Sequence, residues 1–258
     1  MKIIVLVKEV PDTYADRKIN LETGLADRAA SDAVLDEISE RSLEVALSHA
    51  DSAEGTEIVL LTVAPEGATA TVRKGLAMGA GSAIHVVDEG LLGADIILTA
   101  EVLAAAIRRT GFDLVIAGNV STDGSGGMVP AALAELLDVP HLTGLTQVAI
   151  TAESVSGARP VEGGVQQVSA ALPAVISITE ALPDARFPNF KGIMAAKKKP
   201  LETVGLAELG VDPERPDHAR TIMLTIAEKP PRAAGVKITD EGDAAAKLAD
   251  FLVENRLV

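Results

Sequence analysis

The amino-acid sequence predicts an α/β fold with a doubly wound, mostly parallel sheet, and three observations support this prediction. First, short apolar segments typical of buried parallel strands occur at residues 2–7, 57–63, 82–87 and 112–117. Second, segments whose apolar residues have helical spacing separate these strands, which is typical of sheets with helices on both faces. Third, 48% of the 258 residues are hydrophobic and only 2% are aromatic, so a large aliphatic core is expected.

Helices are expected between the strands, at residues 35–47, 70–78 and 94–109. Asp32, Asp36 or Ser39 is suited to cap the start of the first helix, because short polar side chains accept hydrogen bonds from free N–H groups. The carboxyl ends of the first, second and fourth strands are expected to converge on one rim of the sheet. Open α/β sheets usually bind ligands at such a rim.

A glycine-rich segment follows the fourth strand. Residues 118–130 have the sequence GNVSTDGSGGMVP and lead into a predicted helix at 131–137. Glycines let the backbone approach a phosphate closely, and the start of a helix offers free N–H groups. The segment matches neither G-x-G-x-x-G nor G-x-x-x-x-G-K-[ST], so a plain connection between strand and helix remains open.

The second half of the chain has a different pattern. An antiparallel excursion is expected from strands at 147–150, 154–156 and 166–172, with turns at Gly157 and at Gly163-Gly164. A fully apolar strand at 174–178 then returns to the parallel sheet. After a long loop without regular structure, small helical and turn pieces are expected at 201–217, extended segments at 221–227 and 230–242, and an amphipathic helix at 244–255.

The long loop at 183–200 and the C-terminal arm each have two interpretations. The loop holds Phe187, Phe190, Ile193 and Met194 beside a Lys197-Lys198-Lys199 run, so its apolar residues either contact a partner protein or pack on the loop's own sheet. The lysine run is either a solvated face or a site that steers acidic partners. The arm docks either on another chain or on its own sheet.

Composition excludes several classes of function. A net charge of −14 argues against a broad surface for nucleic acid or for anionic membranes. The absence of cysteine excludes disulfides, thiolate nucleophiles and cysteine-based metal sites. His49, His85, His141 and His218 lack the spacing of metal ligands, and no Ser-His-Asp arrangement is apparent, so neither catalytic residues nor a metal is expected. Without a leader or a membrane-length apolar segment, the protein is expected to be cytoplasmic and not inserted in a membrane.

A family resemblance rests on five segments taken together. They are VLVKEVPDT at 5–13, RPVEGGV at 159–165, LPAV at 172–175, IMAAKKKP at 193–200 and PPRAAGVK at 230–237. In this order and spacing, from one end of the chain to the other, they resemble the β subunit of electron transfer flavoproteins. The resemblance implies an adenine-nucleotide α-hydrolase-like fold. It also implies a nucleotide-binding domain at 1–182, a partner recognition loop at 183–200, and an arm at 201–258 that docks on a partner subunit.

The resemblance implies an electron carrier rather than an enzyme. It implies a heterodimer with an α subunit that holds most of an FAD, and a structural AMP, or alternatively a second FAD, in this chain. Electrons would pass from acyl-CoA dehydrogenases or other flavin dehydrogenases, as in fatty-acid β-oxidation, to a quinone oxidoreductase or a similar acceptor. A stand-alone adenine-nucleotide-binding regulator or hydrolase-like enzyme of related fold is the alternative, but it leaves the 183–200 loop and the arm unexplained.

The resemblance also assigns site residues by position. The nucleotide contacts are Leu6, Asp36, Glu37, Ile38, Ser39, Val63, Gly118, Asn119, Val120, Ser121, Thr122, Asp123, Gly124, Ser125, Gly126, Gly127, Met128 and Val129. Tyr14 falls near the position that reaches the dimethylbenzene edge of the flavin. Phe190 falls at the apolar anchor for the dehydrogenase, in a loop shaped by Arg186, Phe187, Ile193 and Met194.

Two departures from the family pattern affect this assignment. Residues 124–128 replace acidic, Asn and Gln residues, so that the backbone alone is left to cradle a phosphate. Asp36-Glu37 replaces an Asn-Pro pair. Because an acidic pair repels phosphate, we expect it to face the ribose or the base, or to cap the helix.

Overall fold

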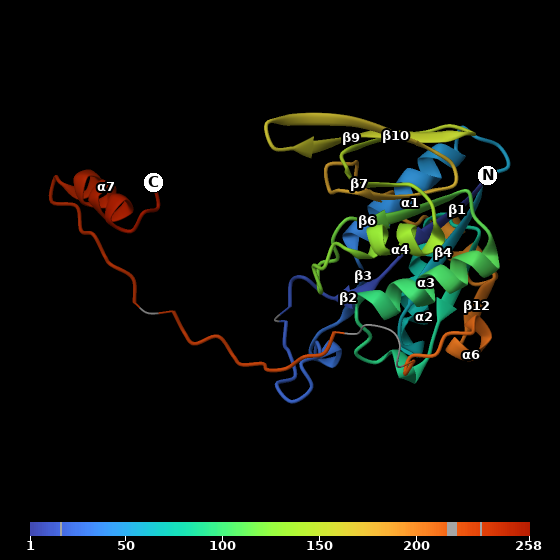
Figure 1. The fold of residues 1–258 in the computed structure, drawn as a ribbon, viewed down its shortest axis with the longest axis horizontal. Coiled ribbons are helices and arrows are strands. Elements are labelled where there is room, and N and C mark those ends of the chain that lie inside the picture. The colour runs from blue at the N-terminus through green and yellow to red at the C-terminus, as the bar shows by residue number, and fades with distance from the viewer. Residues whose placement is uncertain (16, 216–220, 233) are drawn as a thin grey trace. The chain divides into compact units, whose positions relative to one another are not determined.

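The computed structural model describes residues 1–15, 17–215, 221–232 and 234–258, which form two units, Met1–Leu224 and Thr225–Val258. A parallel sheet of seven strands is the centre of the described part of the first unit (Figure 1). Its strands are β1 (Lys2–Leu6), β4 (Glu57–Val63), β5 (Ser82–Val86), β6 (Leu114–Gly118), β7 (His141–Leu145), β11 (Ala174–Ile178) and β12 (Leu201–Val204). Their spatial order is β12-β5-β4-β1-β6-β11-β7. The order reverses between β1 and β6, and such a switch point is the usual ligand position in an open α/β sheet.

Helices cover both faces of this sheet, which confirms the doubly wound prediction. Helices α1 (Glu37–Ala50) and α2 (Thr69–Met78) pack on the face that holds Ile3 and Leu60. Helices α3 (Ile96–Thr110) and α4 (Val129–Leu137) pack on the face that holds Ile4 and Leu61. Neighbouring residues of one strand therefore enter two different cores, because successive side chains of a strand point to opposite faces. This is why the strands are apolar throughout.

A second sheet confirms the antiparallel excursion. Strands β8 (Gln147–Ile150), β9 (Ser154–Val161) and β10 (Gly164–Ala171) pair in the order β10-β9-β8, on the side of the sheet that α1 covers (Figure 1). The prediction of a turn at Gly157 is wrong, because this residue lies within β9 and pairs with Val148 and Val168. A Cβ atom at Gly157 would clash with the carbonyl oxygen of Gln147, so glycine is needed there for the close approach of β8.

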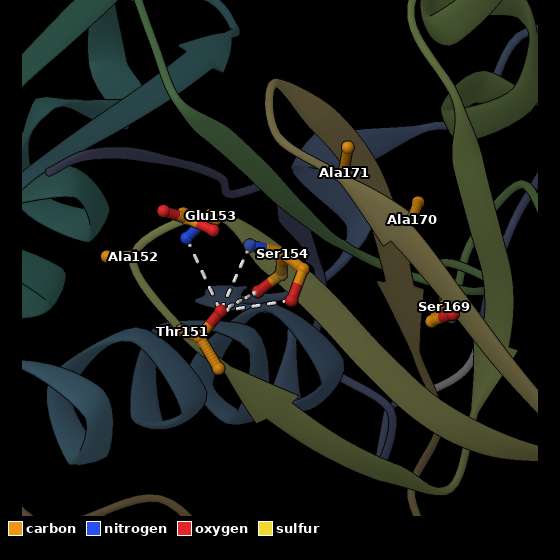
Figure 2. A pocket seen from close by; sticks show the side chains of 7 residues that line it. All are labelled: Thr151, Ala152, Glu153, Ser154, Ser169, Ala170 and Ala171. Carbon is orange, nitrogen blue, oxygen red and sulfur yellow. Dashed lines mark hydrogen bonds between the residues drawn. The ribbon is translucent and has the colours of Figure 1, made fainter.

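The connection between β8 and β9 is a turn held by Thr151. Its hydroxyl accepts hydrogen bonds from the N–H groups of Glu153 and Ser154, as Figure 2 shows. With Ser169 and Ala171 of β10, this turn lines a shallow depression. None of the residues that the sequence assigns to a site lies there, so we regard the depression as a feature of the turn.

Three other predictions need correction. Leu35, expected on the first helix, belongs to β3 (Ala33–Leu35), which pairs with β2 (Glu9–Pro11). The loop at 183–200 is not wholly irregular, because α5 (Phe190–Ala196) forms within it. Residues 201–204 form edge strand β12 and not helical or turn pieces, while α6 (Leu206–Leu209) does match that expectation. Residues 216 and 217 of the same prediction, and His218, lie outside the described residues.

The remaining elements are short. They are the 3-10 turns η1 (Arg28–Ala30), η2 (Glu66–Ala68) and η3 (Glu89–Leu91) in the first unit, and α7 (Ala244–Glu254) in the second. Helix α7 confirms the amphipathic helix predicted at 244–255. Among the described residues, no helix is long and apolar enough to cross a membrane.

Candidate functional site

The rim at the carboxyl ends of β1, β4 and β6 collects most of the residues assigned to the nucleotide. These strands are adjacent and parallel, which confirms the predicted convergence. Leu6 and Val63 are the last residues of β1 and β4, and both are partly buried. Gly118 is the last residue of β6, and from it the loop at 118–128 runs to the start of α4.

Gly118 lets the end of β6 approach the start of α1. A Cβ atom at this position would lie 2.6 Å from Cγ2 of Ile38, closer than nonbonded carbon atoms pack. The glycine therefore has a packing reason apart from any phosphate. The contact brings the loop against α1, two elements about eighty positions apart in the sequence.

Asp36 joins these two elements by a hydrogen bond. It is only 1% exposed, and its Oδ2 accepts the N–H of Thr122 at 3.0 Å. Asp36 occupies the N-cap position of α1, but its side chain makes no capping hydrogen bond there. The buried Oδ1 of Asp36 and Oγ1 of Thr122 have no hydrogen-bond partner among the described residues. These two side chains lie next to each other, so the Thr122 hydroxyl is placed to reach the Asp36 carboxyl with a small change of rotamer, and a ligand group that approaches the rim is a second possible partner.

Ser39 and the backbone of Lys8 fix the start of α1 to β1. The Ser39 hydroxyl accepts the N–H of Lys8 at 3.2 Å, and the N–H of Asp36 donates to the carbonyl of Lys8 at 3.0 Å. Glu37 points outward and is exposed. Of the acidic pair at this helix start, only Asp36 is thus directed into the protein.

A charge cluster that the sequence did not predict surrounds Asp123. Its Oδ1 lies 2.6 Å from Nζ of Lys8, and its Oδ2 lies 3.0 Å from Nη2 of Arg28. Arg17 donates to the carbonyl of the preceding residue, Thr122. Burial opposes ionisation of Asp123, but the hydrogen bond and charge of Lys8, with further hydrogen bonds from Ser121 and Gly124, hold its pKa well below the ordinary value. Asp123 is therefore a carboxylate at neutral pH.

The sequence signal for Lys8 was its position directly after the strand predicted at 2–7, which places it at the rim of the sheet. Arg17 and Arg28 carried no such signal, because they lie in the irregular excursion between β2 and β3. Together these residues place three cations on two consecutive residues of the loop, in a protein of net charge −14. The rim thus gathers three cations, and two of them share the single carboxylate of Asp123.

The second half of the loop exposes backbone N–H groups. Residues 124–128 are exposed, and no described residue accepts a hydrogen bond from the N–H of Gly126, Gly127 or Met128. Positive φ angles at Ser125 (50°) and Gly127 (65°) turn the chain into α4, which begins at Val129. Free N–H groups before a helix start are a favourable site for phosphate oxygens.

In the first half of the loop, several backbone N–H groups already donate hydrogen bonds within the protein. The N–H of Val120 donates to the side chain of Asn119 at 2.8 Å, and the N–H of Gly124 donates to Asp123 at 2.6 Å. The N–H of Asn119 donates to the carbonyl of Ile178 in β11 at 2.9 Å. These bonds, with that of Thr122 to Asp36, occupy four of the backbone N–H groups between residues 119 and 124.

The residues assigned to other molecules lie on the surface. Tyr14 is 95% exposed, and only its backbone N–H is held, by Asp12 at 2.9 Å. Phe187, Phe190, Ile193 and Met194 are all exposed, and the last three lie on α5. Arg186 is different, because its guanidinium is paired with Glu44 and Asp51 of the same chain. In the described part of the chain, no cluster of three or more His, Asp or Glu residues could hold a metal ion.

The buried carboxyl of Asp36 gives a pH-dependent prediction. Burial raises its pKa above the ordinary value, although the N–H of Thr122 opposes this shift. A raised pKa means that Asp36 opposes folding when ionised and ceases to do so as the pH falls below its unfolded value. Asp36→Asn should therefore increase the free energy of unfolding at pH 8, on the order of 1 kcal/mol, because an amide needs less hydration than a carboxylate. Denaturant titrations should show this gain shrinking toward pH 4, and destabilisation at every pH would contradict it.

Comparison with known proteins gives a consistent result. Residues 23–209 match the family described as the electron transfer flavoprotein domain. The chain is 45% identical to the electron transfer flavoprotein subunit beta of Mycobacterium tuberculosis, over 99% of both chains. It is 35% identical to the same subunit of Bacillus subtilis, over 83% of this chain and 82% of that one. It is also 30% identical to the caffeyl-CoA reductase-Etf complex subunit CarD of Acetobacterium woodii, over the whole of both chains.

These similarities cover the rim, the loop that carries α5 and the C-terminal helix. The chain belongs to the electron transfer flavoprotein family, as a β subunit.

Proposed function

We propose that this chain is one subunit of a heterodimer with an electron transfer flavoprotein α subunit, and that the pair carries electrons between flavin enzymes. The observation that carries this proposal is the exposed apolar side of α5, where Phe190, Ile193 and Met194 lie together at helical spacing. Three large apolar side chains on so short a helix are typical of a protein docking site. An FAD held mainly by the α subunit would accept and release the electrons.

The rim suits a nucleotide with a structural role, such as AMP, better than a group that itself transfers electrons. The free N–H groups of residues 126–128 suit the phosphate, and Lys8 and Arg28, which together carry one more charge than the Asp123 carboxylate they pair with, contact the same loop. The unsatisfied Asp36 Oδ1 and Thr122 Oγ1 suit the ribose hydroxyls or the base, because a buried carboxyl group repels a phosphate. No acid–base pair is needed for this role, which is to hold the loop and α1 in place. A second FAD is the alternative occupant, since its adenylate half would present the same groups.

The partners follow from the same proposal. Acyl-CoA dehydrogenases or other flavin dehydrogenases would supply electrons, as in fatty-acid β-oxidation, and a quinone oxidoreductase or a similar acceptor would take them. One relative is named as a subunit of a caffeyl-CoA reductase–Etf complex, which supports a partner that acts on a CoA thioester. Tyr14 would lie at the dimethylbenzene edge of the flavin, and the protein would act in the cytoplasm.

Purification with the co-expressed α subunit tests the proposal. We expect a yellow complex of two chains with a flavin absorbance spectrum, reduced when a flavin dehydrogenase and its substrate are added. Acid release and mass spectrometry should give one FAD and one AMP per heterodimer, whereas two FAD per heterodimer would identify the alternative occupant. A stable, colourless monomer that turns over a nucleotide would instead support a stand-alone regulator or hydrolase-like enzyme.

A further inference from the structure

The segment that carries α5 is fixed to the body of the protein at both ends by arginine side chains. From this geometry we infer that Arg186 and Arg73 are positioning residues, which hold the apolar side of α5 ready for a partner without touching the partner themselves. The inference deepens the proposed function and rests on it for the identity of the partner. The fixation of α5 itself can be tested on this chain alone.

The first clamp joins Arg186 to α1 and the turn that follows it. Nε of Arg186 lies 2.9 Å from Oε2 of Glu44, and Nη2 lies 2.8 Å from Oε1 of the same carboxylate. Nη2 also lies 2.8 Å from Oδ2 of Asp51, and the backbone N–H of Arg186 donates to Glu44 at 3.0 Å. A bidentate pair with a second carboxylate fixes the orientation of the guanidinium as well as its position. The carboxylates that bind the Arg186 guanidinium therefore belong to this chain.

Two contacts of Arg41, also on α1, reinforce this clamp. Its guanidinium donates to the carbonyl of Leu182 and pairs with Asp184. The entry to the 183–200 segment is thus bound to α1 at three nearby positions, residues 182, 184 and 186. A chain bound at such short intervals has little freedom to move relative to α1.

The second clamp joins the end of α5 to α2 in both directions. Nη1 of Arg73 on α2 lies 2.7 Å from the carbonyl oxygens of both Ala196 and Lys199. In return, Nζ of Lys199 lies 2.9 Å from the carbonyl of Leu76 and 2.6 Å from that of Ala80. Helix α2 has no basic residue in its own last turn, so Lys199 supplies the cation that favours a helix C-terminus. Lys199 therefore belongs to the scaffold, while Lys197 and Lys198 of the same run stay exposed.

Between the clamps, α5 lies directly on α2. A Cβ atom at Gly192 would clash with the carbonyl oxygen of Ala77, and Ala196 is buried. Asn189 caps the helix start by accepting the N–H of Gly192 at 2.8 Å. One side of α5 is thus used for packing on α2, which directs Phe190, Ile193 and Met194 away from it.

The clamps matter because α5 is too short to be stable alone. It has seven residues, below the length at which an isolated helix persists in water. Ordering such a segment at the moment of binding would reduce affinity, and fixing it beforehand removes that cost. The exposed Lys191, Lys197 and Lys198 flank the apolar side chains, in a protein of net charge −14. The partner surface that fits is an apolar pocket with an acidic rim.

Spin labelling tests the clamps directly, because the chain has no cysteine. A nitroxide attached at Lys191→Cys, on α5, reports the mobility of the helix in the full-length protein. Arg73→Gln and Arg186→Gln should each increase label mobility. Arg108→Gln is the matched control, since it also removes an arginine bond to a backbone carbonyl, that of Leu136, but on the other face of the sheet.

The same variants, without the label, are then compared as electron acceptors of a flavin dehydrogenase in the heterodimer. The KM for the carrier should rise about tenfold in Arg73→Gln and Arg186→Gln, with kcat within about twofold. In these variants α5 is no longer ordered before binding, so the dehydrogenase must order it, which weakens docking but leaves electron transfer in the complex unchanged. Arg73→Lys and Arg186→Lys should recover part of the affinity, and Arg108→Gln should match the wild type.

The outcomes separate the inference from the proposed function. Unchanged label mobility in both variants would show that the clamps do not hold α5. A raised KM without raised label mobility would show that the arginines contact the dehydrogenase themselves. Raised label mobility with an unchanged KM would show that the order of α5 does not affect docking. If instead Phe190→Ala has no effect on reduction while the clamp variants do increase mobility, the clamps stand and the docking role of α5 fails.

Discussion

Phe190→Ala is expected to lower kcat/KM for dehydrogenase-driven reduction of the heterodimer by about 10- to 100-fold. Phe190 is 79% exposed on α5, so it contributes little to the stability of this chain. Burial of a phenylalanine side chain in a partner's pocket contributes about 1.5–3 kcal/mol, which corresponds to an effect of this size. The loss should appear mainly in KM, because docking precedes electron transfer. Stopped-flow reduction at subsaturating carrier measures it.

Two controls make the result specific to the anchor. Phe190→Leu should keep most of the activity, because leucine retains an apolar group of similar reach. Leu92→Ala removes an exposed apolar side chain directly after η3 and should leave KM unchanged. The FAD content and the elution volume of the heterodimer should match the wild type in all three variants. Wild-type kinetics for Phe190→Ala would refute the role of Phe190 as the anchor.

Removal of residues 225–258 is expected to abolish stable assembly with the α subunit while leaving the first unit folded. Every buried residue of the described chain lies between Ile3 and Leu206, and none lies in the second unit. Helix α7 has eleven residues, none of them buried, and Leu248 is 50% exposed. An amphipathic helix of this length is marginal in water without a surface to cover its apolar side. We therefore propose that this surface belongs to the partner subunit.

Co-purification and circular dichroism test the truncation together. The shortened chain should keep its thermal midpoint and the helical signal of the first unit, but bind the α subunit at least about 100-fold more weakly, equivalent to about 2.8 kcal/mol. Leu248→Glu in the full-length chain should weaken assembly in the same direction, whereas Lys247→Gln on the charged side should not. A large fall in the thermal midpoint of the truncated chain alone would show that the arm docks on its own sheet instead.

Different physical causes explain which parts of the fold could be predicted. The central strands were identifiable because a strand covered on both faces needs apolar residues throughout, as in β1 and β6. Helix α5 was missed because its seven residues include Gly192, a weak helix former that is present for its contact with Ala77. Strand β12 was missed because it lies at the edge of the sheet and buries only Val204 among its four residues.

The candidate site was predictable only in part. The glycine loop and the start of α1 follow from the order of elements, since parallel strands end at a common rim. The cluster of Lys8, Arg28 and Asp123 does not follow from it, because these residues come from separate loops with no periodic pattern. The same holds for Arg186, whose partner Glu44 lies 142 positions away in the sequence.

The sequence by itself determined the α/β class, the rim that holds the glycine loop, the segment that carries Phe190 and the family resemblance. These features rest on local patterns of apolar residues and on short motifs, which a linear chain displays. Only the tertiary structure decided that Asp36 faces Thr122, that Lys8 pairs with Asp123, and that Arg73 and Arg186 bind the two ends of the segment that carries α5. The reason is that hydrogen bonds and ion pairs act over a few ångströms in space, and folding alone brings such distant residues within that range.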